Sequence, residues 1–110
     1  SGNLIATAGY KVYTALLSQI GNAAPTATVL ENTLGGTVVW SRTGTGVYRG
    51  VLTGAFTSDK TFQVIGASNN SFILLATSGI SEVVINTYNS SGTTSEGLLS
   101  KASYEIRVYN

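Results

Sequence analysis

The side chains that could do acid–base chemistry in this chain are its carboxylic acids. They are Glu31, Asp59, Glu82, Glu96 and Glu105, and neighbouring ones are at least nine residues apart. This spacing gives no local calcium-binding loop. Only the fold could assemble a carboxylate pair of the glycosidase type, and all five acids occur at positions typical of turns or solvent-facing strand residues. We therefore expect a protein that is not an enzyme.

The residue types used most often for nucleophiles and transition-metal ligands are missing. The sequence contains no histidine and no cysteine. Serine–histidine and cysteine–histidine pairs are excluded, and so are imidazole and thiolate ligands for zinc, copper or iron. We predict no catalytic residue, no metal site and no bound cofactor.

One short stretch gathers side chains that could bind a ligand. Arg42 and Arg49 flank the turn at residues 43–46, and Trp40 and Tyr48 stand beside them. Guanidinium groups and an indole ring could form a small platform for an anion or a sugar, and tyrosine is a frequent interface residue. The alternative, which we favour, is structural: the arginines protect a sheet edge, and Trp40 belongs to the core.

The same stretch contains a glycine-rich run, residues 44–50, that superficially resembles a phosphate-binding loop. It has one residue too many for the GxGxxG pattern, lacks a following Lys-Ser or Lys-Thr, and leads into a strand. A phosphate loop needs a helix N-terminus to hold the anion. A hairpin turn is the better interpretation.

The elements that position these residues are short strands. In residues 37–52, two runs of β-branched and aromatic residues surround the turn, which predicts a hairpin. Further strands are expected at 10–20, 26–33, 61–66, 71–77, 80–88 and 103–109. Residues 34–36 should close a hairpin into the central pair, residues 1–9 should be loose or an edge strand, and residues 89–97 should form the most mobile loop. In the last strand Tyr104, Ile106 and Val108 should face inward.

Eight or nine short strands separated by turn signals are typical of a sandwich or barrel. We predict a single all-β domain over residues 1–110, an antiparallel β-sandwich of jelly-roll type. An immunoglobulin-like sandwich would give nearly the same string of strands. A helix competes with the strand at 10–20, because Leu16, Leu17 and Ile20 also fit a 3.6-residue period.

The composition restricts the partners. Only 10% of the residues are charged and the net charge is +1, against about 25% charged residues in an average domain. This gives no electrostatic footprint for nucleic acid. The longest apolar run, residues 72–76, is far shorter than the roughly 18 residues of a membrane-spanning helix.

Two predicted strands, 10–20 and 71–77, are apolar on both faces, whereas a small sandwich has one interior. The second apolar face needs a cover. We expect this cover to be another copy of the chain, which predicts a homo-oligomer.

Residues 42–48, a Gly-Thr-Gly-x-Tyr turn between an aromatic strand and an alternating one, resemble small β-domains of phage tail and head fibres and other virion appendages. Similar hairpins occur in trimeric jelly-roll heads of the complement-globular type, and residues 11–54 resemble short proteins encoded beside phage structural genes. The resemblance covers about the first half of the chain and supplies no catalytic residues. It implies a trimeric structural or adhesive protein in a virion or outside cells, with other virion proteins or a cell-surface glycan as further partners.

Two functions follow as hypotheses. The first is a non-enzymatic structural module of a virion or surface appendage with an attachment role. The alternative is a carbohydrate-binding β-sandwich in which Trp40 or an exposed tyrosine stacks against a sugar and arginine or asparagine side chains anchor it.

Overall fold

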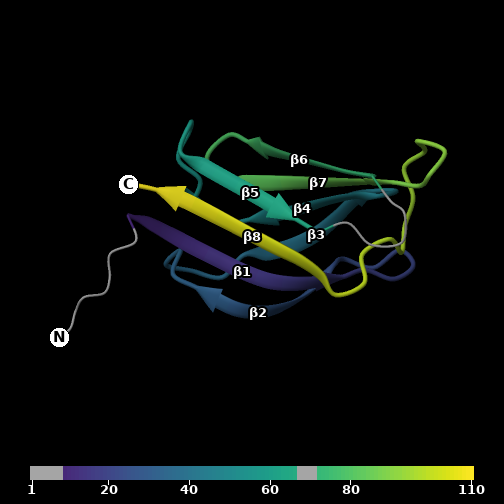
Figure 1. Cartoon of the computed structure of the whole chain (residues 1–110), viewed down its shortest axis with the longest axis horizontal. Helices are drawn as coiled ribbons and strands as arrows, with labels where there is room; N and C mark the ends of the chain where they lie inside the picture. The colour runs from purple at the N-terminus through teal and green to yellow at the C-terminus, as the bar shows by residue number, and fades with distance from the viewer. Residues whose placement is uncertain (1–8, 67–71) are drawn as a thin grey trace.

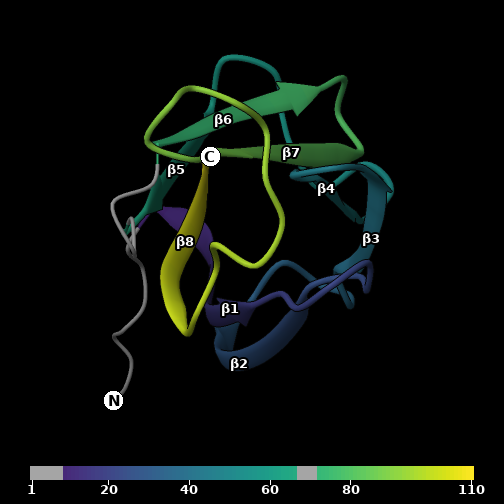
Figure 2. The same cartoon turned by 90° about the vertical axis from the view of Figure 1, so that its right-hand side faces the viewer.

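The computed structural model describes residues 9–66 and 72–110 as an all-β, sandwich-like fold (Figure 1). Two four-stranded antiparallel sheets face each other, as the end-on view in Figure 2 shows. The predicted all-β sandwich is confirmed at this level. The segment predicted as loose or an edge strand, residues 1–9, lies outside the described residues except for Gly9.

The first sheet, sheet A, has the strand order β2-β1-β8-β5, and sheet B has the order β3-β4-β7-β6. The eight strands of the described residues are β1 (Tyr10–Ser18), β2 (Thr26–Asn32), β3 (Val39–Gly44), β4 (Val47–Val51), β5 (Thr61–Ile65), β6 (Phe72–Ser78), β7 (Glu82–Tyr88) and β8 (Ala102–Tyr109). The helix that competed for residues 10–20 is thus replaced by a strand. Among the described residues, no helix has the length and apolar character needed to cross a membrane.

The core lies between the sheets and follows from strict alternation along the strands. On β8, Tyr104, Ile106 and Val108 are buried as predicted, whereas Arg107 is only partly buried and Tyr109 is exposed. Successive side chains of a strand point to opposite faces, so one parity fills the interior. The remaining large buried side chains are Tyr13, Leu17, Leu34, Val38, Tyr48, Phe56, Val83, Ile85 and Leu99.

The hairpin predicted for residues 37–52 is confirmed as β3 and β4. Arg42 pairs with Tyr48 and Ser41 with Arg49, and the register shifts between Arg42 and Gly44. Gly46 has a φ of 69°, a left-handed conformation that glycine adopts without a steric cost. The turn therefore needs a glycine at this position.

The prediction that residues 34–36 close a hairpin is wrong. The strand before them, β2, pairs with β1 in sheet A, and the strand after them, β3, belongs to sheet B. Leu34 is buried in the core, and Asn32 holds the connection by accepting a hydrogen bond from the Leu34 N–H and donating one to the Gly36 carbonyl. The buried Leu34 thus anchors the connection between the two sheets.

Residues 71–77 are apolar on both faces as predicted, but within one chain only one face of the strand that the structure describes there, β6, is buried. It is an edge strand of sheet B, and Phe72 and Leu74 are 60% and 59% exposed on its outer face. Ile73 and Leu75 pack against the core. The outer apolar side chains are uncovered because the described part of the chain forms two layers only.

Candidate functional site

The hairpin divides the four candidate ligand-binding residues between two faces. Arg42 pairs with Tyr48 across the strands, and Trp40 shares their side of sheet B, which faces sheet A. Arg49 has the other parity, lies on the outer face and forms an ion pair with Glu82 of β7. The structure therefore brings three of the candidates together and separates Arg49 from them.

Trp40 lies at the margin of the core. Its indole N–H donates a 3.1 Å hydrogen bond to the Tyr13 hydroxyl, and its ring meets Tyr104 edge-on at 5.6 Å between centroids. A Cβ atom added to Gly50 would come within about 3 Å of the indole ring, so the glycine makes room for it. Burial raises the pKa of Tyr13 although the hydrogen bond from Trp40 acts to lower it. These contacts agree with the favoured structural interpretation of Trp40.

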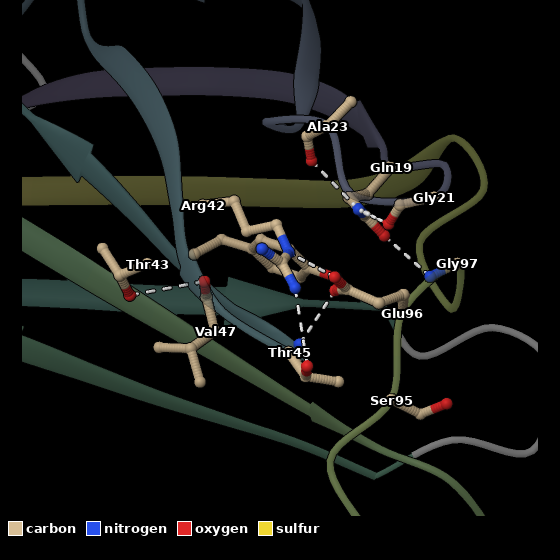
Figure 3. Close-up of polar contacts among 12 residues, drawn as sticks. Gln19, Gly21, Ala23, Arg42, Thr43, Thr45, Val47, Ser95, Glu96 and Gly97 are labelled. Atoms are coloured by element: carbon tan, nitrogen blue, oxygen red, sulfur yellow. Dashed lines mark hydrogen bonds and ion pairs between the residues drawn. The ribbon is translucent and has the colours of Figure 1, made fainter.

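The carboxylate of Glu96 collects donors from the hairpin, and we call Arg42, Gly46, Tyr48 and Glu96 the Glu96 cluster. One oxygen accepts 2.8 and 2.7 Å hydrogen bonds from the Gly46 N–H and the Tyr48 hydroxyl. The other oxygen pairs with the Nε atom of Arg42 (Figure 3). The three donors lie at the end of the sandwich where the β3–β4 turn meets the loop after β7.

The electrostatics of the Glu96 cluster favour the charged carboxylate. Partial burial would by itself raise the pKa of Glu96, but the Gly46 N–H, the Tyr48 hydroxyl and the Arg42 guanidinium together hold it below its usual value. Burial, followed by the hydrogen bond to Glu96, raises the pKa of Tyr48. Tyr48 therefore remains a protonated donor at neutral pH, and Glu96 remains an anion.

A second set of hydrogen bonds fastens the same loop, residues 89–97, which the sequence predicts to be the most mobile. The buried Gln19 side chain accepts a 2.7 Å hydrogen bond from the Gly97 N–H and donates to the carbonyls of Gly21 and Ala23 (Figure 3). The hydroxyl of Thr87, which is also buried, donates to the Ser95 carbonyl at 2.8 Å. The loop is thus tied to both sheets.

Three of the carboxylic acids each form an ion pair with a different arginine. Glu96 pairs with Arg42, Glu82 with Arg49, and Glu105 with Arg107. Glu82 lies on the outer face of sheet B and Glu105 on that of sheet A, at opposite sides of the sandwich. The pairing neutralises charge within the chain. Within residues 9–66 and 72–110, no group of three or more potential metal ligands is found.

The outer face of sheet A has an aromatic end that the sequence pattern does not predict. The rings of Tyr10 and Tyr109 are 5.0 Å apart, and the guanidinium carbon of Arg107 lies 4.8 Å from the Tyr10 ring centroid. Phe62 of β5 pairs with Arg107 and is 50% exposed. The outward parity of Arg107 and Tyr109 was visible in the sequence, but their alignment with Tyr10 and Phe62 depends on strand pairing.

The face also carries an apolar groove of about 220 Å³ at the other end of β8. Leu16, Leu30 and Val64 line its walls, and Ser103 and Glu105 of β8 lie between them. A larger cavity of about 310 Å³ opens at the edge of the sandwich near Lys11 and Lys60. Of these features, the outer face of sheet A is the best candidate for an interaction surface, because aromatic residues and arginine are enriched in protein interfaces.

Comparison of the chain with protein-family models, with curated proteins and with solved structures finds no match.

Proposed function

We propose that this chain is a non-enzymatic structural module that assembles with copies of itself, in a virion or a surface appendage outside cells. The observation that supports self-assembly is the exposed apolar surface of both sheets. Val39, Phe72 and Leu74 of sheet B and Phe62 and Val64 of sheet A are all exposed on outer strand faces or edges. Exposed apolar surface on sheet faces marks interaction sites in globular proteins.

The charged residues support the same proposal. Three of the five acids are paired with arginines of the same chain, which leaves the apolar faces close to neutral. Interface centres are depleted in unpaired charge. An attachment role, with a virion protein or a cell-surface glycan as the target, comes from the resemblance of residues 42–48 to virion appendages.

The jelly-roll assignment belongs to this proposal. β1 pairs with β8 and β4 with β7, and β5 contacts β6 although the two strands belong to different sheets. These pairs are nested like a long antiparallel hairpin wound over itself. Winding of this kind supports a jelly roll, which also consists of two packed antiparallel sheets.

The test is the mass in solution. Light scattering during size exclusion at micromolar concentration should give a multiple of the 11.4 kDa chain mass. The resemblance to trimeric heads favours three copies, whereas a two-fold contact would give two. A monomer at these concentrations would contradict self-assembly.

A second candidate function, carbohydrate binding, has one specific observation in its favour. Tyr10 and Tyr109 offer ring surface beside Arg107 and Glu105, and tyrosine rings with adjacent polar groups suit sugar stacking. A glycan array should then show binding that Tyr109→Ala removes. If Trp40→Ala removes it instead, the sugar site belongs on the hairpin, and if the array shows no binding this candidate fails.

A further inference from the structure

The outer face of sheet A combines a ridge and a groove at opposite ends of its central strand β8. The ridge consists of Tyr10, Phe62 and Tyr109, which surround Arg107. Tyr109 is 41% exposed, so the ridge offers aromatic surface to a partner. Aromatic and arginine side chains dominate the binding energy of many interfaces.

The groove has room for a side chain. Ser103 is small, and its neighbours in the sheet are Leu16 on one side and Gly66 on the other. With Leu30 and Val64 at its walls, the groove leaves about 220 Å³ for a side chain from outside.

Strand pairing places the ridge and the groove symmetrically. Tyr13 of β1, Ile106 of β8 and Gln63 of β5 form one row across the sheet. On β8, Arg107 and Glu105 lie one residue to either side of this row, and Tyr109 and Ser103 lie three residues to either side.

The neighbouring strands repeat this relationship. On β1, Tyr10 and Leu16 lie three residues to either side of Tyr13. On β5, Phe62 and Val64 lie one residue to either side of the row. A half-turn about the row therefore exchanges ridge positions for groove positions on all three strands.

We propose that two copies of the chain pack through the outer faces of sheet A. They are related by a two-fold axis that runs parallel to the row Tyr13–Ile106–Gln63 and lies just outside that face. In this contact Tyr109 of each copy lies over Ser103 of the other, and Arg107 lies over Glu105. A two-fold contact uses the same patch on both partners, so the patch must be complementary to itself. The inference rests on the self-assembly proposed above and names its surface and symmetry.

The charges on the outer face of sheet A favour a second copy of the chain as its binding partner. Arg107 and Glu105 pair within one chain and can pair equally well across the two-fold axis, so no like charges face each other. Like charges in contact would oppose association. A partner of unrelated sequence would have no reason to match this spacing.

The area is sufficient for a stable contact. The strands of sheet A contain 9, 7, 5 and 8 residues. At about 3.4 Å per residue and about 4.8 Å between strands, they give a face of about 470 Å² in projection. Side chains that stand out from the sheet raise its accessible area towards the about 800 Å² that each partner contributes to a standard interface.

The experiment reverses one charge of the Arg107–Glu105 pair at a time. Arg107→Glu makes positions 105 and 107 both negative, and Glu105→Arg makes both positive. Each variant alone should dimerise about 100-fold more weakly, because like charges then meet across the axis. An equimolar mixture of the two variants should recover a mass of twice the chain, since the negative face fits the positive one. The intrachain pair is absent from both variants, so only an intermolecular pairing explains recovery.

The outer face of sheet B supplies the matched control. Arg49→Glu and Glu82→Arg remove the ion pair on that face and should leave the mass unchanged.

A third variant tests the groove of sheet A. Ser103→Trp fills the groove at an exposed position and should, like the charge variants alone, give monomers with an unchanged circular dichroism spectrum.

Each other outcome has one meaning. If the wild type is a monomer, the proposed self-assembly fails with this inference. If the wild type is a trimer, self-assembly stands and the two-fold pair is wrong. If the wild type is an oligomer that Arg107→Glu, Glu105→Arg and Ser103→Trp leave intact, self-assembly stands and this face is wrong. If the mixture of charge variants stays monomeric, the two-fold register is wrong.

Discussion

The Tyr48 hydroxyl donates a 2.7 Å hydrogen bond to the Glu96 carboxylate, which lies 48 residues later in the sequence. Tyr48 is fully buried, and the side chain of Glu96 is only 18% exposed. The same carboxylate oxygen accepts the Gly46 N–H, so the hairpin turn and the loop after β7 share one anion. The Glu96 cluster thus fixes the loop to the sheet through charge-assisted hydrogen bonds.

Replacing Glu96 by glutamine should lower the free energy of unfolding by about 1–3 kcal/mol, because neutral hydrogen bonds replace charge-assisted ones. Urea denaturation followed by tryptophan fluorescence measures the change. Glu31→Gln is the control, since Glu31 is exposed on the edge strand β2 and should stay within about 0.5 kcal/mol of the wild type. Equal losses in both variants would mean that the cluster adds no stability of its own.

The contribution of Glu96 should depend on pH. The folded state holds the pKa of Glu96 below the ordinary value of 4.5, so its stabilisation is complete above that pH. The stabilisation is lost as the pH falls from 4.5 through the folded pKa, because the Glu96 carboxylate is then protonated and loses its charge-assisted hydrogen bonds. The difference in unfolding free energy between wild type and Glu96→Gln should therefore shrink from about pH 7 to about pH 3. A constant difference over this range would show that the carboxylate is not ionised preferentially in the folded state.

Local patterns predicted those parts of the fold that depend on local geometry. Alternation with a period of two residues encodes the face of each side chain directly, which is why the inward set on β8 was predicted correctly. The hairpin of β3 and β4 was equally accessible, because a glycine turn and two flanking strands are adjacent in sequence. The connection at residues 34–36 was not, because its two strands join different sheets, and local patterns do not encode which sheet a strand joins.

The candidate site shows the same division. Arg42 and Arg49 surround one turn in the sequence, yet the register pairs Ser41 with Arg49 and thereby sends the two guanidinium groups to opposite faces. The register includes an irregularity after Arg42 that no pattern in the sequence marks. Glu96 was placed among solvent-exposed residues because its surroundings are rich in serine, threonine and glycine. Its partner Arg42 is 54 residues away, and long-range contacts of this kind leave no local signal.

The turn glycines give a matched pair of substitutions. A Cβ atom on Gly46 would lie 2.7 Å from the Thr87 carbonyl oxygen and 2.8 Å from the Ser95 N atom, and its φ of 69° disfavours any L-residue. Gly46→Ala should cost on the order of 2–5 kcal/mol through overpacking and backbone strain together. Gly44→Ala in the same turn meets open space and should change the unfolding free energy by less than about 1 kcal/mol. Thermal unfolding of the two variants makes the comparison, and similar losses would contradict the close approach at Gly46.

Substitutions of Trp40 separate a core role from a binding role. Trp40→Ala removes the edge contact with Tyr104 and leaves the buried Tyr13 hydroxyl without its donor, so it should cost about 2–4 kcal/mol. Trp40→Phe keeps most of the ring packing and should cost about 0.5–1.5 kcal/mol for the lost hydrogen bond. Both are measured by urea denaturation with circular dichroism, because the chain has no other tryptophan to report unfolding by fluorescence. If Trp40→Ala keeps its stability within about 0.5 kcal/mol and loses binding on a glycan array, the indole serves a ligand and not the core.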